Sequence, residues 1–261
     1  MESFFESAKG KIWYDLINKN SKKNLLLIHG FMEDHEIWDE LKENLNANII
    51  LVDLLGFGDS TPNKSFDFSM QQHAKSIYEL LEFLNPQNLY ILAHSMVGYI
   101  TLELSLLNPE INIGLLHSTC VSDSDERKEN RNKTIEILER DSSVFIREFY
   151  WNLFAEHRKN EFAIMIDILK YKAEKIPTEY IIETVKALRD RKDHTQTWNI
   201  SGGDNILIGG TYDKLLNVEE LEELSFLGES DWAEMENSGH MGFYEEPERL
   251  RAIVRYWMDL E

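Results

Sequence analysis

The chain contains a single cysteine, Cys120, so it can form no internal disulfide, and nothing in its cysteine content points to an oxidising compartment. We expect Cys120 to be a small buried apolar residue rather than a reactive thiol. The sequence also lacks a cysteine pair and a His-x-x-x-His spacing. It therefore contains no pattern of a structural zinc site.

Long apolar runs are absent as well. No run approaches the roughly 18 residues that a membrane-spanning helix needs. Residues 1–9 lack the apolar core that follows the basic residues of a secretion signal. We therefore expect neither secretion nor membrane insertion, and we take the cytoplasm as the default location.

Basic residues are scarce: 27 Lys and Arg face 47 Asp and Glu, for a formal net charge of -20. Such a surface repels the phosphates of nucleic acids and the headgroups of anionic lipids. We expect no nucleic-acid or membrane partner, and the net charge further predicts that strongly anionic substrates would be repelled on approach. The oligomeric state is not readable from the sequence.

Proline is also rare, and its five residues are too scattered to mark a linker. No internal repeat is visible. A chain of 261 residues with 43% hydrophobic residues can bury one large core, so we expect one domain with an inserted subdomain. The pair Gly56-x-Gly58 lacks the further glycine, lysine or threonine of a nucleotide-binding loop, so nucleotide binding fits poorly.

The first half alternates short apolar runs with amphipathic stretches, which is typical of a mostly parallel sheet covered by helices. The expected helices are 36–45 and 69–84, the second opening with Ser69 and Gln72 in the spacing of a capping box. The expected strands are 24–28, 49–54, 89–92 and 113–116.

After Cys120 the pattern changes to charged segments with helical periodicity. We interpret residues 122–199 as an inserted helical cap, and residues 1–121 together with 200–261 as the α/β core. The helices expected in the cap are 134–138, 144–154, 162–171 and 180–188. The core then resumes with expected strands 205–208 and 231–236 and a final helix, 246–258.

Residues 89–98 form an apolar strand that runs directly into Ser95 and a helix-like segment, an arrangement that resembles the nucleophile elbow of α/β-hydrolases. In that turn a strained backbone lifts the serine oxygen above the sheet. Ala93 adds little bulk, but Val97 stands where the family has glycine, and Gly98 follows one position later. The alternative is that Ser95 is an ordinary helix N-cap.

A serine nucleophile needs a base and a group that orients the base. In α/β-hydrolases the order is serine, acid after a late strand, then histidine before the last helix. Asp213 and His240 occupy these places, although each could instead be an ordinary loop residue. Asp123 is the substitute acid, ranked below Asp213, and Asp204 would lie at the opposite end of its strand.

Together these segments resemble the α/β-hydrolase superfamily along nearly the whole chain. The resemblance implies an eight-stranded, mostly parallel sheet, a site at the carboxyl ends of its strands, and no metal or organic cofactor. The His29-Gly30 segment resembles the oxyanion-hole loop, and the implied donors are the backbone N–H groups of Phe31 and Met96. His29 would shape this loop, and His94 would pack or orient.

Serine at position 95 argues against the dehalogenase and epoxide-hydrolase branches, which place aspartate there. The resemblance therefore implies a carboxylesterase acting on a small ester-like substrate. Lactone, thioester or carbon–carbon bond hydrolysis would use the same three residues, and Val97 leaves open a ligand-binding relative with little turnover. A scaffold protein would leave the ordered triad unexplained. The cap aromatics Phe145, Phe149, Tyr150, Trp151 and Phe154 would either close over the pocket or fix the cap to the core.

Overall fold

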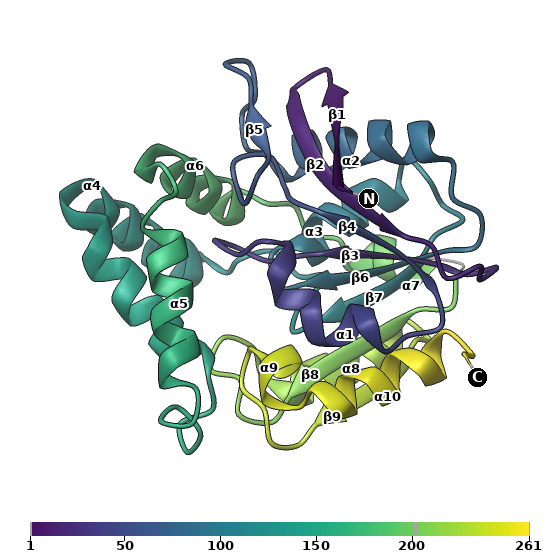
Figure 1. Cartoon of the computed structure of the whole chain (residues 1–261). Helices are drawn as coiled ribbons and strands as arrows, with labels where there is room; N and C mark the ends of the chain where they lie inside the picture. Colours follow the sequence, from purple (N-terminus) through teal and green to yellow (C-terminus); the bar gives the residue numbers. More distant parts are fainter. Residues whose placement is uncertain (1, 201–202, 261) are drawn as a thin grey trace.

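The computed structural model describes residues 2–200 and 203–260 and is built around one sheet (Figure 1). Its strands follow the order β1-β2-β4-β3-β6-β7-β8-β9. The predicted core segments also include residues 1, 201, 202 and 261, which lie outside the described residues. The strands are β1 (Glu2–Ser7), β2 (Gly10–Ile17), β3 (Asn24–Ile28), β4 (Asn48–Val52), β5 (Thr61–Pro62), β6 (Leu89–His94), β7 (Asn112–Leu116), β8 (Ile206–Gly210) and β9 (Asp231–Met235).

The prediction of a mostly parallel, eight-stranded sheet is confirmed. The strands from β4 to β9 in the sheet order pair in parallel, and β1 and β2 join as an antiparallel hairpin at one edge. The two-residue β5 adds a short ninth strand beside β2. All six residues of β6 are buried, because a central parallel strand is covered on both faces.

Helices cover both faces of the sheet, with α1 and α10 on one and α2 and α3 on the other (Figure 1). The predicted cap of α2 is confirmed in part, since Ser69 Oγ accepts the N–H of Gln72 at 3.2 Å. The helices of the core are η1 (His35–Trp38), α1 (Asp39–Glu43), α2 (Met70–Leu84), α3 (Val97–Ser105), α8 (Val218–Leu227), α9 (Gly242–Glu245) and α10 (Pro247–Trp257).

The segment between β7 and β8 is helical, as the periodicity predicts. It contains α4 (Asp125–Leu153), α5 (Ala163–Ala173), α6 (Thr178–Arg189) and α7 (Thr195–Ile200). Figure 1 shows α4, α5 and α6 grouped beside the sheet. Within the described ranges, no helix combines the length and apolar character that crossing a membrane requires.

The two helices expected at 134–138 and 144–154 are joined in α4, which is a correction. A local break remains at Asp141, whose φ of -162° and ψ of 99° leave the helical region. The Asp141 carboxylate accepts the Ser143 N–H at 3.0 Å and its hydroxyl at 2.7 Å, so it caps the second half of the helix. The patterns also missed the edge hairpin and α8, in which only some of the residues are buried.

Candidate active site

Ser95 lies in the tight turn between β6 and α3, where the carboxyl ends of the central strands meet. Its φ of 54° places it in the left-handed region, which is costly for a residue with a side chain. The Ser95 N–H donates to Leu116 O at 2.9 Å and so ties the turn to β7. Ser95 is therefore held in the strained conformation that its sequence context predicts.

Val97 does not prevent this turn. It is fully buried, and the close approach falls at Gly98, where an added Cβ would lie 2.1 Å from Ser118 Oγ. The glycine that lets α3 pass close to β7 therefore stands one residue later than the family pattern suggests.

His240 lies in the loop between β9 and α9, and its Nε2 is 2.7 Å from Ser95 Oγ. Two bonds hold its backbone: its N–H donates to Leu153 O at 2.7 Å, and its carbonyl lies 3.0 Å from His94 Nε2. Gly239 is needed here, because an added Cβ would lie 2.6 Å from the backbone of Ala155. The imidazole thus approaches the serine from a fixed loop.

Asp213 follows β8, and its Oδ2 lies 2.7 Å from His240 Nδ1. Its other oxygen accepts the N–H groups of Leu215 at 2.8 Å and Leu216 at 3.3 Å. Burial acts to raise the pKa of Asp213, but the charges and hydrogen bonds of His240 and His117 together outweigh burial and lower it. Asp213 therefore remains an anion although its side chain is buried.

The same pair sets the protonation of His240. Burial acts to lower the pKa of His240, but the charge and hydrogen bond of Asp213, with the charges of Glu33 and Glu245, outweigh burial and raise it above the ordinary value. An imidazole that faces a hydroxyl on one side and a carboxylate on the other can take a proton from the hydroxyl.

Phe31 and Met96 line the same pocket as Ser95. Within the described residues, neither of their backbone N–H groups has a hydrogen-bond partner. Gly30 cannot carry a side chain, because a Cβ would lie 2.7 Å from His94 Nδ1. Tyr150, on α4, donates its hydroxyl to Met32 O at 2.6 Å and so holds the residue that follows Phe31. Two backbone donors thus remain available beside the serine.

A buried pair, Glu33 and His94, links the three loops of the site and was missed by sequence reasoning. Glu33 Oε2 accepts the Gly30 N–H and lies 2.8 Å from His94 Nδ1. The other nitrogen of His94 faces the His240 carbonyl. Burial acts to raise the pKa of Glu33, but His94, the Gly30 N–H and His29 together outweigh burial and lower that pKa. The expectation that His94 orients rather than reacts agrees with this geometry.

His117 is a second residue that the sequence did not reveal. Its Nδ1 lies 3.5 Å from Asp213 Oδ2, and burial lowers its pKa to about 4. Within the described chain, one cluster could offer a metal three ligand atoms, formed by His117, Asp213 and His240. Asp213 Oδ2 and His240 Nδ1 of this cluster already lie 2.7 Å apart in a hydrogen bond.

The other titratable residues considered from sequence lie elsewhere. Asp123 is buried and its carboxylate is paired with Arg131 and Arg191 rather than with His240. His73 is enclosed in the core, and His157 lies against Tyr212 with ring centroids 4.6 Å apart. Cys120 is buried as expected, and burial raises the pKa of its thiol to about 11.

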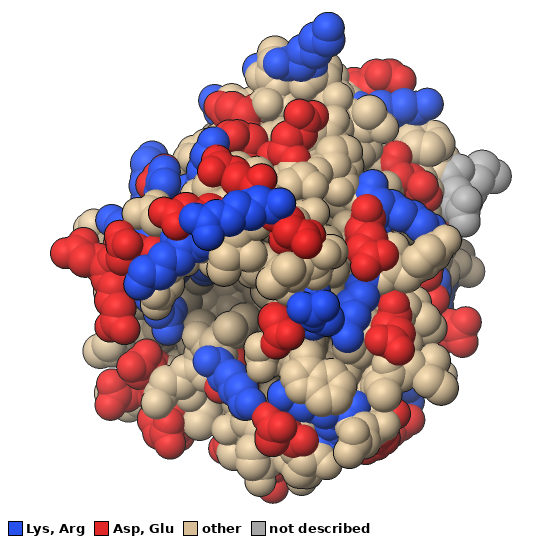
Figure 2. Space-filling model, turned by 90° about the vertical axis from the view of Figure 1, so that its left-hand side faces the viewer, with Lys and Arg blue, Asp and Glu red and all other residues tan. Residues whose placement is uncertain are grey.

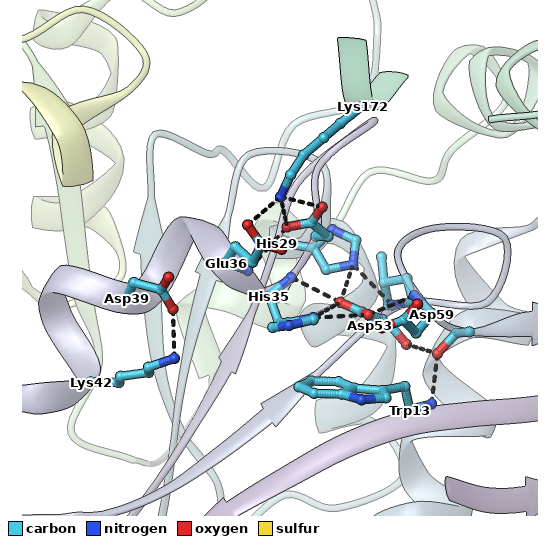
Figure 3. A network of polar contacts seen from close by, with 12 residues as sticks. Trp13, His29, His35, Glu36, Asp39, Lys42, Asp53, Asp59 and Lys172 are labelled. Carbon is cyan, nitrogen blue, oxygen red and sulfur yellow. Dashed lines mark hydrogen bonds and ion pairs between the residues drawn. The ribbon is translucent and has the colours of Figure 1, made fainter. Parts of the chain in front are cut away.

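His29 supports the loop that carries Phe31, as expected. Its Nε2 accepts the Leu54 N–H at 3.0 Å, and Nδ1 lies 2.9 Å from Gly30 O. Figure 3 shows the adjoining network, in which buried Asp53 binds the His35 ring at 3.0 Å and Lys172, from α5, binds Glu36. The segment around Asp53 is therefore scaffold that joins the strand ends to α5.

A pocket of about 400 Å³ opens at Ser95. The aromatic residues of α4 and of its C-cap, Phe154, divide between the two expected roles: Phe145 and Phe149 line the pocket, whereas Tyr150 and Phe154 are buried. Trp151 is partly exposed. The full lining is Phe31, Ser95, Met96, Tyr99, His117, Arg127, Asn130, Arg131, Thr134, Phe145, Phe149, Leu188, Arg191, Lys214, Leu215, Leu216 and His240.

Solved structures with similar folds include esterases. One is a thermophilic esterase from Thermogutta terrifontis with malate bound, at TM-score 0.87 and 23% identity, covering 99% of this chain and 98% of that one. Another is an esterase from Exiguobacterium antarcticum, at TM-score 0.89 and 21% identity, covering 99% and 100%. These likenesses establish the fold.

Curated relatives match shorter segments. A pimeloyl-[acyl-carrier protein] methyl ester esterase from Aeromonas salmonicida is 33% identical over 89 residues, which is 33% of this chain and 34% of the relative. An uncharacterized hydrolase, YugF from Bacillus subtilis, is 28% identical over 102 residues, 38% of this chain and 37% of the relative. The matches thus span little more than a third of these relatives.

The model of the alpha/beta hydrolase fold family matches residues 23–247, which include Ser95, Asp213 and His240. This match covers most of the chain and agrees with the sheet order and with the hydrolases among its relatives. The chain therefore belongs to the α/β-hydrolase family.

Proposed function

We propose that this protein is a serine hydrolase that cleaves a carboxylic ester of a small substrate through an acyl-enzyme on Ser95. The observation that carries the proposal is the unbroken chain of contacts from Ser95 through His240 to Asp213, with both links at 2.7 Å. Ser95 is half-buried at the wall of the pocket, so a substrate can reach its hydroxyl.

In the first half of the proposed cycle, Ser95 Oγ attacks the ester carbonyl carbon while His240 Nε2 takes the hydroxyl proton. The carbonyl oxygen becomes negative and is bound by the N–H groups of Phe31 and Met96. The bond to the alcohol then breaks, and His240 returns its proton to the departing oxygen.

In the second half, His240 takes a proton from water, which attacks the acyl-enzyme. When this intermediate collapses, the bond to Ser95 Oγ breaks, His240 returns its proton to that oxygen, and the carboxylic acid is released. Asp213 keeps the imidazole oriented and stabilises its charge at both stages. Besides the ester and water, the proposed cycle uses only side chains and backbone groups of this chain.

The proposal extends to the role of residues 122–199 as a cap on a core of residues 1–121 and 200–261. Phe145 and Phe149 place an apolar wall of α4 opposite the Ser95 turn, and Leu153 binds the His240 backbone. Such a helix would limit substrate size and exclude water from the reacting bond. The substrate is therefore proposed to be a small molecule.

The test is hydrolysis of a series of 4-nitrophenyl esters, together with labelling by a fluorophosphonate. We expect Ser95→Ala to lower kcat by a factor of about 10³ or more and to abolish labelling. The control is Ser65→Ala, which changes an exposed serine that does not line the pocket. Lactones and thioesters assayed beside the esters would establish the preferred acyl bond.

Turnover and labelling that persist in Ser95→Ala would contradict the proposal. An unmutated protein that neither turns over nor labels would instead support a ligand-binding relative.

A further inference from the structure

The pocket at Ser95 has an unusual charge for this chain. Four basic side chains line it, Arg127, Arg131, Arg191 and Lys214, and its lining of described residues contains no Asp or Glu. The whole chain carries a formal charge of -20. Figure 2, which views the side formed by α4, α5 and α6, shows a hollow with Lys and Arg atoms above and below it.

Helix α4 presents two different surfaces to this pocket. Before the break at Asp141, its pocket-lining residues are polar and follow helical spacing: Arg127, Asn130, Arg131 and Thr134. After the break, the lining residues are Phe145 and Phe149. The pocket therefore has a cationic part and an apolar part on one helix.

The positive charge of the arginines in the cationic part is only partly neutralised by carboxylates. Asp123 is the carboxylate that meets the arginines: its Oδ2 lies 3.2 Å from Arg131 Nε, and its Oδ1 lies 2.7 Å from Arg191 Nη1. One carboxylate thus faces two guanidinium groups. Arg191 is almost fully buried and lies 4.1 Å from the centre of the Tyr99 ring, so its position is fixed.

Arg131 and Arg127 keep donors free for a ligand. The Arg131 side chain is 34% exposed, and its contact with Asp123 uses Nε. Both of its Nη groups therefore remain available to donate hydrogen bonds to a ligand. Arg127 donates to the Leu215 carbonyl at 3.3 Å and has no carboxylate partner in the described part of the chain. Lys214 is paired with Glu156 at 2.5 Å, so it adds less to the positive charge of the pocket than the arginines do.

We propose that the substrate of the Ser95 site is an ester that carries a second, negatively charged group, a carboxylate or phosphate, bound by Arg127 and Arg131. Phe145 and Phe149 would contact its apolar part. This inference rests on the proposed function and names its substrate class. Guanidinium groups bind such anions with paired, charge-assisted hydrogen bonds. The net charge of the chain predicts that anions are repelled, but the local positive potential of the pocket would attract them at this site.

The test compares two esters of equal acyl length, mono(4-nitrophenyl) adipate and 4-nitrophenyl hexanoate, which differ by the terminal carboxylate. We expect kcat/KM for the adipate ester to exceed that for the hexanoate ester by about tenfold or more. Arg127→Gln and Arg131→Gln should each reduce this ratio several-fold, and the ratio should fall as salt increases. Arg140→Gln, on the same helix but outside the pocket lining, should leave the ratio unchanged.

A ratio of one or below, unchanged in both arginine variants, would overturn the anionic substrate while leaving the esterase intact. If neither ester is hydrolysed, the proposed function fails, and calorimetric titration decides the anion site separately. Adipate or hexyl phosphate should then bind the unmutated protein and bind Arg131→Gln several-fold more weakly. The uncharged control, 1,6-hexanediol, should not bind. Absence of binding by both anions would reject the site.

Discussion

At the scale of single residues, the charge of Asp213 sets the behaviour of His240. Their 2.7 Å bond raises the pKa of His240, which must be neutral to accept the serine proton. Activity should therefore fall as the pH drops through a midpoint above 6.5, the ordinary value for histidine. Above that midpoint the imidazole is neutral and the rate should reach a plateau.

Replacing the carboxylate should change both the rate and this pH profile. We predict that Asp213→Asn lowers kcat by a factor of roughly 10⁴, because an amide no longer selects the imidazole tautomer or stabilises its charge. The acid midpoint should move to lower pH, since the charge that raises the pKa of His240 is gone. A pH profile of kcat/KM measures both effects, and an unmoved midpoint would contradict the assignment of Asp213.

Glu33 is a positioning residue because it touches Gly30 and His94 but not Ser95. We predict that Glu33→Gln lowers kcat/KM about tenfold, because the charge-assisted bond that joins the Gly30 loop to His94 weakens. Fluorophosphonate labelling should persist at a reduced rate, and Glu33→Ala should lose more activity than Glu33→Gln. Equal losses in the two variants would argue against a role for the retained hydrogen-bond acceptor.

At the scale of elements, the packing of α3 against β7 positions Ser95. Gly98 leaves no room for a side chain beside Ser118. We predict that Gly98→Ala costs about 1–3 kcal/mol in free energy of unfolding, as overpacked cores do. It should also lower kcat/KM, because the turn that carries Ser95 must shift. Chemical denaturation and ester hydrolysis measure the two effects.

A second substitution separates this clash from other causes. Ser118→Ala removes the oxygen that would lie 2.1 Å from the new Cβ, so the double variant should recover part of the lost stability and activity. Strictly additive effects would show that the two residues do not clash.

At the scale of the whole molecule, buried histidines should make the fold sensitive to acid. Burial lowers the pKa of His73 to about 3, and the ring has no hydrogen-bond partner among the described residues. The unfolded chain takes up a proton on His73 below about pH 6.5, whereas the folded chain resists it to about pH 3. Stability should therefore decrease as the pH falls through this window, by on the order of a few kcal/mol.

His73→Leu should weaken this dependence. It removes two buried nitrogens without partners, so we expect stability at pH 7 to rise by about 1 kcal/mol and acid unfolding to move to lower pH. Thermal unfolding between pH 7 and pH 4 measures the change, with the exposed His157→Gln as the control. His35 and His240 act in the opposite direction because their pKa values are raised. An unchanged pH dependence in His73→Leu would show that other groups control acid stability.

Local sequence patterns were sufficient for the parallel strands of the sheet and for the order of the site residues along the chain. A strand is recognised by its buried apolar run, and β3 begins and ends where the pattern predicts. The turn at Ser95 and the loop before α9 carry residue combinations with strong local preferences. Element ends were less accurate: the strand expected at 49–54 ends at Val52, and the Leu54 N–H donates to the His29 ring instead of to a neighbouring strand.

The amino-acid sequence by itself determined the α/β fold, the places of Ser95, Asp213 and His240, and the net acidic charge. Only the tertiary structure decided which polar groups meet inside it: Glu33 with His94, His117 with Asp213, and Arg131 of α4 with Asp123. The reason is physical. Periodicity reports which side of an element is buried, and on a charged helix such as α4 a pocket-facing arginine has the same local pattern as a solvated one.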